Sequence, residues 1–517
     1  MKIGTLVALA CTGMTATSVA VWTTTRPAPD AIPTTAIAST TSPAPAASTP
    51  TLSFTPADPQ PLAATPDQSS FVADGTLRME GRIGHAVLPA GASSETFLFV
   101  DLSAADQIAQ TRAPLDLSIV IDRSGSMKGK RLRNAVAAAR TAIQRLDDGD
   151  VVSVVSYSTN IEIDVPATTI TPQSRPRVLA ALDGLRARGD TCISCGIQTG
   201  MQLIGQRPGR VSRLLLLSDG EATAGVRNED GFRRIAEQCR RMGTAITSIG
   251  VDVDYNERIM ATLARSSNGR HFFVESAAGL PAIFDQEMQR LLRTVATDTA
   301  LAVDLAPGVF VEEVFDRGFR QEGSGRLVVP LGTFAAGERK TLLARLRVPG
   351  TGIGQRPVAD VRLSYRDLVT DRASTGEGRL AALMSNDPAQ LAPLDGLVSA
   401  RISQSVAATT LEKANALASR GDVSGAQSLI REQKRELSQR RARSAGSVSA
   451  NRRVDFDKGF DELDDILGGA AEGFADAPAA DPSASGAGAG RFARPPAARK
   501  NKAQVRANQA AAVELGF

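Results

Sequence analysis

Apolar strands alternate with amphipathic helices over residues 114–296. The stretch RLLLLSD at 213–219 is a continuous apolar run that ends in a turn, which is typical of a parallel strand covered on both faces. Strand–helix units repeated over this length predict a doubly wound α/β domain. After the run LDLSIVID, apolar residues recur at helical spacing through 130–146: Leu132, Val136, Ala139, Ile143 and Leu146.

Short strands punctuated by Gly and Pro flank this domain on both sides. Residues 76–103 hold two short apolar runs around a Pro-Ala-Gly-Ala turn, and the same texture returns over 299–366. A hairpin alone is too small to be stable, so we expect the two stretches to pair into one small antiparallel β sandwich. The α/β domain is then an insertion between the two halves of the sandwich.

The N-terminal residues are typical of a targeting segment followed by a spacer. Residues 3–22 carry no charge, begin with an apolar run that suits a signal-peptide core, and contain a small-x-small cleavage motif at 18–20. The same stretch is long enough to cross a bilayer, and Cys11 leaves a lipid anchor open. Residues 23–66 are rich in Pro, Thr, Ala and Ser, as in extended spacers. We therefore expect a cell-envelope protein that is periplasmic, secreted or anchored, with any membrane association through residues 3–22.

Beyond the sandwich the pattern becomes helical and then compositionally biased. A helix hairpin is predicted over 397–443, with its break at Gly421-Asp422, and a disordered tail is predicted from 446 onward because Ala, Gly, Pro and Arg dominate there. Within this tail, 455–467 forms an amphipathic island that either folds onto a partner or stays solvated. Its apolar face consists of Phe456, Phe460, Leu463 and Leu467. The predicted segments are 1–22 (signal peptide or anchor), 23–66 (spacer), 67–113 (β segment), 114–296 (α/β domain), 297–372 (β segment), 373–445 (helical region) and 446–517 (disordered tail).

Charge and histidine content exclude several classes of function. The formal net charge of +4 is small for 517 residues and the arginines are scattered, so no nucleic-acid partner is indicated. Only two histidines occur, which argues against histidine-based catalysis and against a zinc enzyme.

The loop DRSGS at 122–126 follows the strand LDLSIVID and admits several interpretations. A phosphate loop fails because its glycines would need four intervening residues, and a nucleophilic serine would need Gly-x-Ser-x-Gly. Helix capping accounts for part of the pattern, but not for the spacing of two between Asp122, Ser124 and Ser126. Side chains two apart in an extended loop face the same way, and carboxylate and hydroxyl oxygens suit Mg²⁺. We therefore interpret the loop as a metal site at the carboxyl edge of the sheet.

Together with two later positions, this loop resembles the metal ion-dependent adhesion site of von Willebrand factor type A domains. That pattern continues with a Thr in a second loop, supplied by GDTCIS, and an Asp after a later strand, supplied by LLLLSDGEAT. The resemblance implies a Rossmann-like fold over 114–296. It also implies a Mg²⁺ ion (or Mn²⁺ or Ca²⁺) and a partner carboxylate that completes its coordination. The implied metal ligands are Asp122, Ser124, Ser126, Thr191 and Asp219.

The wider arrangement is similar to that of bacterial exported proteins in which such a domain sits within a small β sandwich. Inter-α-trypsin inhibitor heavy chains and chloride-channel-accessory proteins carry a similar domain, but the metalloprotease motif His-Glu-x-x-His of the accessory proteins does not occur in this sequence. We expect a non-enzymatic protein-binding or adhesion module whose partner is a protein with an acidic side chain. Two other classes stay open: an adaptor subunit for an ATPase-driven assembly or metal-insertion system, and a divalent-metal hydrolase.

Cys192 and Cys195 directly follow Thr191 and are expected to form a local disulfide. An exported protein meets an oxidising compartment, and a Cys-x-x-Cys pair at a helix start permits bridging. Two reduced, buried cysteines are the alternative. A bridge would stiffen the loop that carries the Thr191 hydroxyl.

Overall fold

The computed structural model of the chain describes residues 68–106, 112–205, 209–219, 221–252, 255–323, 325–448, 450–475 and 496–516. The leader expected at 1–22 and the spacer expected at 23–66 lie outside these ranges. No helix within the described ranges is long and apolar enough to cross a membrane.

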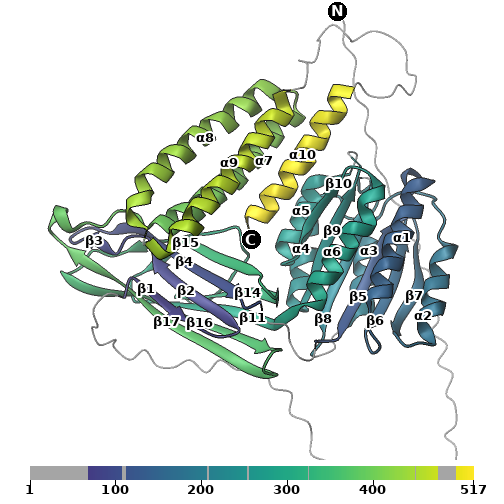
Figure 1. Ribbon diagram of the computed structural model, residues 1–517, viewed down its shortest axis with the longest axis horizontal. Helices are drawn as coiled ribbons and strands as arrows, with labels where there is room; N and C mark the ends of the chain where they lie inside the picture. Colours follow the sequence, from purple (N-terminus) through teal and green to yellow (C-terminus); the bar gives the residue numbers. More distant parts are fainter. Residues whose placement is uncertain are drawn as a thin grey trace, which may run out of the picture. The chain divides into compact units, whose positions relative to one another are not determined.

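The α/β domain is built on a six-stranded sheet, and the prediction of a doubly wound fold is confirmed (Figure 1). Neighbouring strands run parallel, except for the last pair, in which β7 is antiparallel to β6. The strands are β5 (Leu115–Asp122), β6 (Val151–Tyr157), β7 (Ile161–Thr169), β8 (Val211–Ser218), β9 (Thr244–Val251) and β10 (His271–Val274), in the order β10-β9-β8-β5-β6-β7. The helices are α1 (Lys130–Arg145), α2 (Ser174–Ala181), α3 (Ile193–Ile204), α4 (Glu229–Arg241), α5 (Glu257–Ser266) and α6 (Leu280–Leu292).

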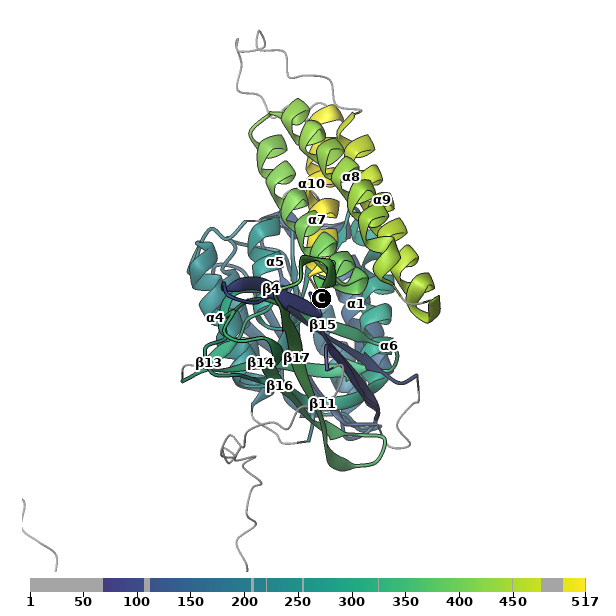
Figure 2. The ribbon, with the colours of Figure 1, turned by 90° about the vertical axis from the view of Figure 1, so that its left-hand side faces the viewer.

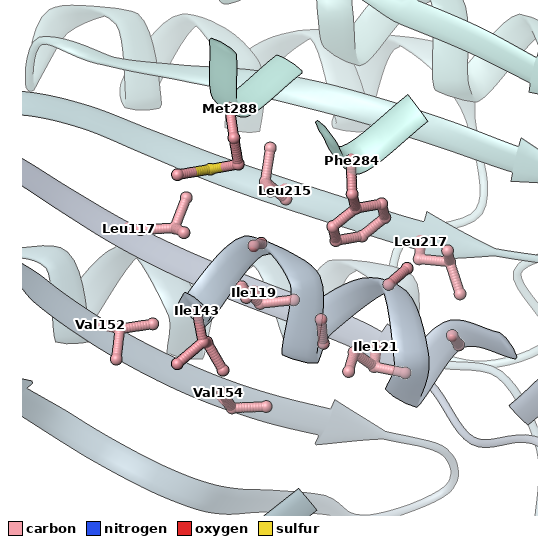
Figure 3. Close-up of a cluster of buried hydrophobic side chains, with 14 of the residues drawn as sticks. Leu117, Ile119, Ile121, Ile143, Val152, Val154, Leu215, Leu217, Phe284 and Met288 are labelled. Carbon is pink, nitrogen blue, oxygen red and sulfur yellow. The ribbon is translucent and has the colours of Figure 1, made fainter. Parts of the chain in front are cut away.

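Strand β5 lies in the middle of this sheet, and all eight of its residues are buried. Alternate side chains point to opposite faces, so its apolar run serves two cores. One core, between the sheet and helices α1 and α6, is shown in Figure 3; it contains Leu117, Ile119 and Ile121. On the other face Val120 packs with α3. The helix approaches the strand so closely that a Cβ at Gly200 would come within 2.7 Å of Val120, so this contact requires glycine.

Two sheets form the β sandwich, and residues before and after the α/β domain pair within it. The ten-residue ladder between β4 and β15 joins the two halves, so the predicted pairing is confirmed. The second half extends past its predicted limit at 372, because β17 folds back along β16. One sheet has the order β1-β2-β4-β15-β12, with β1 (Ser70–Ala73), β2 (Leu77–Ile83), β4 (Ser94–Ala104), β15 (Arg339–Val348) and β12 (Phe310–Phe315). The other has the order β13-β14-β11-β16-β17-β3, with β13 (Arg320–Glu322), β14 (Arg326–Ala335), β11 (Thr294–Leu305), β16 (Gly354–Asp367), β17 (Arg372–Ser385) and β3 (Val87–Pro89).

Four further helices form a bundle, which Figure 2 shows edge on: α7 (Gly396–Ser419), α8 (Val423–Ser444), α9 (Arg453–Ala475) and α10 (Pro496–Leu515). The hairpin α7–α8 breaks where it was predicted to, since Gly421 has a φ of 91° and the Asp422 side chain caps α8. The prediction of a disordered tail from 446 onward is wrong over 453–475 and 496–515, which are helical and packed. Residues 476–495 lie outside the described ranges.

The apolar face of the amphipathic island at 455–467 is buried within the same chain, rather than bound to another protein or exposed to solvent. Phe456, Phe460, Leu463 and Leu467 are at most 1% exposed and pack with residues of α7 and α8. The sequence indicated the apolar face but not the helices that pack against it. The preceding α7–α8 hairpin packs against this face, so α9 completes a hydrophobic core within the same chain.

Candidate metal centre

The predicted metal residues gather at the carboxyl edge of the α/β sheet. Asp122 is the last residue of β5, and the short helix η1 (Gly125–Met127) turns the loop after it. Asp219 directly follows β8, the parallel neighbour of β5. Because the two strands run the same way and pair side by side, the residues that follow them meet at one edge.

Four of the five residues are connected through short hydrogen bonds. Ser126 donates through Oγ to Asp219 Oδ1 at 2.7 Å, and the hydroxyls of Ser124 and Ser126 lie 2.9 Å apart. The Ser124 amide donates to Asp122 Oδ1 at 2.8 Å, while Ser218 Oγ donates to Asp122 Oδ2 at 2.9 Å. Two carboxylates and two hydroxyls, from the end of β5 and the loops after β5 and β8, are thus held at one place.

Thr191 is attached to this group through its main chain. Its amide donates to Thr223 Oγ1 at 2.9 Å, and its carbonyl accepts from the Thr223 amide, also at 2.9 Å. The Gly125 amide donates to the Gly189 carbonyl at 3.0 Å, so the loop of Thr191 is fixed against the loop of Ser124. Within the described part of the chain, the Thr191 hydroxyl does not take part in the bonds that join the other four residues.

Burial makes both carboxylates at this edge costly to ionise. The Asp122 and Asp219 residues are 0% and 1% exposed. Burial, followed by the charge of Asp219, raises the pKa of Asp122 to about 6. The pKa of Asp219 is also raised, chiefly by burial, and the Ser126 hydroxyl and Arg131 act against that rise.

The donor set fits a small, hard divalent cation. Such ions prefer oxygen ligands and stabilise adjacent carboxylates that would otherwise repel each other. Within the described ranges, no three His, Cys, Asp or Glu side chains cluster in a way that could hold a metal. A cation at Asp122 and Asp219 would therefore be bound by two carboxylates and by the hydroxyl groups beside them.

Two further charged residues belong to this edge, and the sequence analysis did not assign them to it. Arg131, in the first turn of α1, lies 3.1 Å from Asp219 Oδ2 through Nη1 and also pairs with Asp252. Asp252 directly follows β9, the strand beside β8. The strand order could have indicated Asp252, because it occupies the same position after its strand as Asp219. The contact with Arg131 depends on how α1 packs and left no signal in the sequence.

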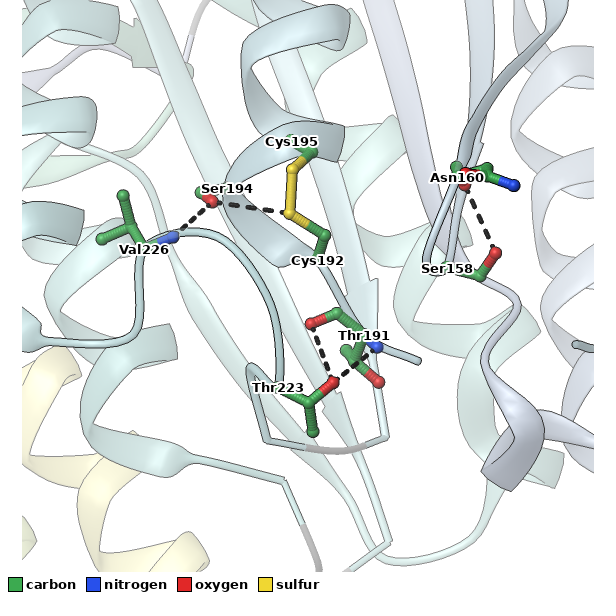
Figure 4. The surroundings of a disulfide bond; sticks show 8 residues. All are labelled: Ser158, Asn160, Thr191, Cys192, Ser194, Cys195, Thr223 and Val226. Atoms are coloured by element: carbon green, nitrogen blue, oxygen red, sulfur yellow. Dashed lines mark hydrogen bonds between the residues drawn. A yellow bond between two sulfur atoms is a disulfide. The ribbon is translucent and has the colours of Figure 1, made fainter. Parts of the chain in front are cut away.

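The expected disulfide between Cys192 and Cys195 is present at the start of α3, next to Thr191 (Figure 4). The loop that follows Asp219 packs directly against it: the Val226 amide donates to Ser194 Oγ at 3.0 Å. A Cβ at Gly225 would come within 2.6 Å of Cys192 Sγ, and Gly225 has a φ of 69°, so this close approach requires glycine. The bridge therefore lies between the two loops that carry Thr191 and Asp219.

Comparison with known proteins identifies what this domain is similar to. Residues 116–286 match the family model of the von Willebrand factor type A domain. The uncharacterized protein YfbK of Escherichia coli (strain K12) is 27% identical over 264 residues, which cover 49% of this chain and 45% of YfbK. The human inter-alpha-trypsin inhibitor heavy chain H4 is 25% identical over 278 residues, which cover 51% of this chain and 29% of the heavy chain. The chain thus spans less than half the length of either of these two curated relatives.

Among solved structures, a von Willebrand factor type A protein from Catenulispora acidiphila is similar in fold. It superposes with a TM-score of 0.62 at 17% identity, over 81% of this chain and 92% of that one. The likeness therefore extends beyond the α/β domain.

Proposed function

Because residues 116–286 of this chain form a von Willebrand factor type A domain, we propose that the domain binds another protein through a metal-held carboxylate. The metal is Mg²⁺, or Mn²⁺ or Ca²⁺ in its place, and the partner presents an acidic side chain. The proposed ligands are Asp122, Ser124, Ser126, Thr191 and Asp219.

The observation that carries this proposal is the bonded chain from Ser124 through Ser126 to Asp219, beside buried Asp122. Buried carboxylates are usually paired or bound to a metal. Arg131 pairs with Asp219 from one side, but no cation of the described chain is bonded to Asp122, whose recorded partners are serine groups. A divalent ion would stabilise both charges at once.

Each residue has a definite task in this proposal. The Ser218 hydroxyl and the Ser124 amide orient the Asp122 carboxylate. The two serine hydroxyls present oxygens from the same loop as Asp122, and Asp219 presents its carboxylate from the loop after β8. The main chain of Thr191 is fixed by Thr223. When bound, the cation supplies an open coordination position for a carboxylate oxygen of the partner.

We propose a binding protein rather than an enzyme. Two titratable side chains at this edge, Arg131 and Asp252, pair with each other, which favours a binding role over proton transfer. The proposed location is the cell envelope; this part rests on the sequence pattern of the first 66 residues.

The experiment is capture of envelope proteins on the immobilised full-length protein, with mass spectrometry of what is retained. We expect a defined set of acidic partners in Mg²⁺ that is absent in EDTA and absent for Asp219→Asn. The matched control is Asp183→Asn, because the Asp183 side chain is 70% exposed and its carboxylate pairs, among the described residues, with Arg140 alone. An identical set retained in EDTA and by Asp219→Asn would contradict the proposal.

A further inference from the structure

A cavity of 590 Å³ lies far from the metal centre, at the other end of strand β8. Arg213 stands near the start of β8 and Asp219 follows its end, so the two are separated by roughly 20 Å of extended chain. The α/β domain contributes Arg270 and Arg290, the β14–β15 hairpin contributes Glu338 and Lys340, and α10 contributes an alanine-rich wall.

Carboxylates behind and beside this cavity are already satisfied by cations other than Arg213. Buried Glu287 accepts from Arg290 at 3.0 and 3.1 Å and from Thr247 at 2.7 Å. Glu338 accepts from Arg290 at 3.2 Å and from the Ala335 amide at 2.7 Å. Burial alone would raise the pKa of Glu287, but Arg290 and Arg213 outweigh it and lower that pKa to about 2. Burial would likewise raise the pKa of Glu338, but Lys340 and Arg290 outweigh it and lower that pKa. Both carboxylates are therefore ionised.

The positive charge nevertheless exceeds the negative charge. Arg213, Arg290 and Lys340 face two carboxylates, and Lys340 donates to the carbonyls of Leu331 and Thr333 rather than to an acid. Its ammonium lies 3.7 Å from Glu338, which is already bonded to Arg290. One buried cation is left without a counter-ion of its own.

That cation is Arg213, which is only 2% exposed. Its Nε and Nη1 atoms have no hydrogen-bond partner among the described residues, and its nearest recorded carboxylate oxygen, on Glu287, is 3.9 Å away. The remaining contact, from Nη2 to Thr333 Oγ1, is long at 3.5 Å. Burial, and then the charge of Arg290, lowers the pKa of Arg213 to about 10, so the guanidinium stays charged at neutral pH. Unpaired buried N–H groups of a charged side chain are rare and costly.

We propose that this cavity is a binding site for an oxyanion, either a phosphate or sulfate group or the carboxylate of a small molecule, with Arg213 as its principal ligand. Nε and Nη1 lie on different edges of the planar guanidinium, and Nη2, whose contact with Thr333 is long, completes each edge. Either edge can therefore offer two donors to two oxygens of such a group. Arg270, whose side chain is 32% exposed and pairs with exposed Glu514, adds positive charge on the more open side of the site. The small side chains of Ala507, Ala510 and Ala511 on α10 leave room for the body of the ligand.

This site is independent of the proposed metal centre, and the experiment keeps the two apart. Isothermal titration of the full-length protein in EDTA uses phosphate, sulfate and citrate as probes, with chloride at equal ionic strength as the reference. We expect at least one oxyanion to bind with a Kd below roughly 10 mM, an affinity worth about 3 kcal/mol. Phosphate or sulfate alone would identify an inorganic-type site, and citrate alone would identify a carboxylate site.

The Arg213→Met variant should weaken that binding at least tenfold, while Arg431→Met, on the exposed surface of α8, should leave it unchanged. If Arg213→Met does not fold, Arg270→Met serves as the second variant and should weaken binding about threefold. Binding of none of the three anions to the wild type, or wild-type affinity in the folded arginine variants, would overturn the proposal.

Discussion

Nη1 of Arg131 lies 3.1 Å from Oδ2 of Asp219, so the chain itself places a permanent cation against one carboxylate of the proposed metal centre. The same nitrogen donates to the Ser126 carbonyl at 3.0 Å, and Nη2 pairs with Asp252. The Arg131 side chain is 33% exposed, whereas that of Asp219 is buried. A divalent ion that binds Asp219 must therefore share this carboxylate with the guanidinium.

Replacing Arg131 by Gln should strengthen metal binding. The substitution removes a positive charge that repels the ion and competes for Asp219. We therefore expect the Mg²⁺ affinity to rise roughly tenfold, which corresponds to about 1.4 kcal/mol of binding free energy. Isothermal titration of Mg²⁺ measures the change, with Arg133→Gln on the exposed face of α1 as the control. Weaker Mg²⁺ binding in Arg131→Gln would mean that the arginine orients Asp219 rather than competing for it.

Removing the disulfide should affect the metal centre more than the fold. Replacing both Cys192 and Cys195 by Ser opens a very short loop, so the free energy of unfolding should fall by no more than about 2 kcal/mol. The Mg²⁺ affinity should fall severalfold, because the bridge lies between the loops of Thr191 and Asp219. Urea unfolding and Mg²⁺ titration give the two values.

The control for the disulfide is mild reduction. It should reproduce the effect in the wild type and do nothing to the double variant, since the other described cysteine, Cys239, is a buried free thiol. A Mg²⁺ affinity that is indifferent to reduction would contradict a role for the bridge at this site.

His271 should make the protein less stable in mild acid. It is buried, and its Nδ1 lies 3.0 Å from Ser248 Oγ, which itself donates to the Met260 carbonyl. Nδ1 is therefore the protonated nitrogen, and Nε2 accepts from the Tyr255 hydroxyl at 3.2 Å. This arrangement favours the neutral ring, and burial lowers the pKa of His271 from 6.5 to about 4.

The sign follows from the order in which the two states take up the proton. As pH falls below 6.5 the unfolded chain is protonated at His271 first, so the free energy of unfolding decreases until about pH 4, by about 3 kcal/mol in total. Above pH 6.5 this contribution is fully present. Urea unfolding across this window should show a shallower slope for His271→Gln than for the wild type. His85→Gln should reduce the slope less, because His85 is only partly buried and its pKa, although also lowered by burial, is less strongly shifted. Equal slopes in the wild type and His271→Gln would show that His271 does not titrate in this way.

Helix α10 should behave as part of the folded protein. Arg506 donates through Nη2 to the Tyr255 carbonyl at 2.9 Å and pairs with Glu257 at the same distance, which fixes α10 against α5. Arg506→Ala should lower the free energy of unfolding by about 2 kcal/mol, because these partly buried groups lose their partner. The exposed Arg420→Ala is the control.

Hydrogen exchange provides a second readout for α10. Amides in the middle of 496–515 should be protected in the wild type to nearly the extent of those in α7, and less so in Arg506→Ala. Exchange at the rate of an unstructured peptide throughout this stretch would show that the tail is disordered after all.

Sequence reasoning succeeded where local pattern and burial coincide. A strand covered on both faces must be apolar along its whole length, which is why β5 and β8 were recognisable. Asp219 was assigned to the site of Asp122 through the resemblance to von Willebrand factor type A domains. Ser124 and Ser126 followed from their spacing within one loop.

What escaped prediction depends on contacts between distant segments. Arg131 reaches Asp252 only because of how α1 docks on the sheet, and the excess charge at Arg213 arises where three separate parts of the chain meet. Helix α10 was missed, and only the apolar face of α9 was recognised, because the composition of the whole tail is that of a disordered segment. Phe456 and Phe460 pack on a surface that exists only once the α7–α8 hairpin has formed.

The most direct test of the metal centre is a Mg²⁺ titration of the purified full-length protein by calorimetry, alongside Ser126→Ala and Asp219→Asn. Ser438→Ala and Asp183→Asn, both on exposed surface, are the matched controls. One Mg²⁺ should bind to the wild type and to both controls. The affinity should fall at least tenfold in Ser126→Ala and in Asp219→Asn, a loss of about 1.4 kcal/mol of binding free energy or more. Equal Mg²⁺ affinity in all five proteins, or no binding of Mg²⁺, Mn²⁺ or Ca²⁺ to the wild type, would contradict a metal centre at these residues.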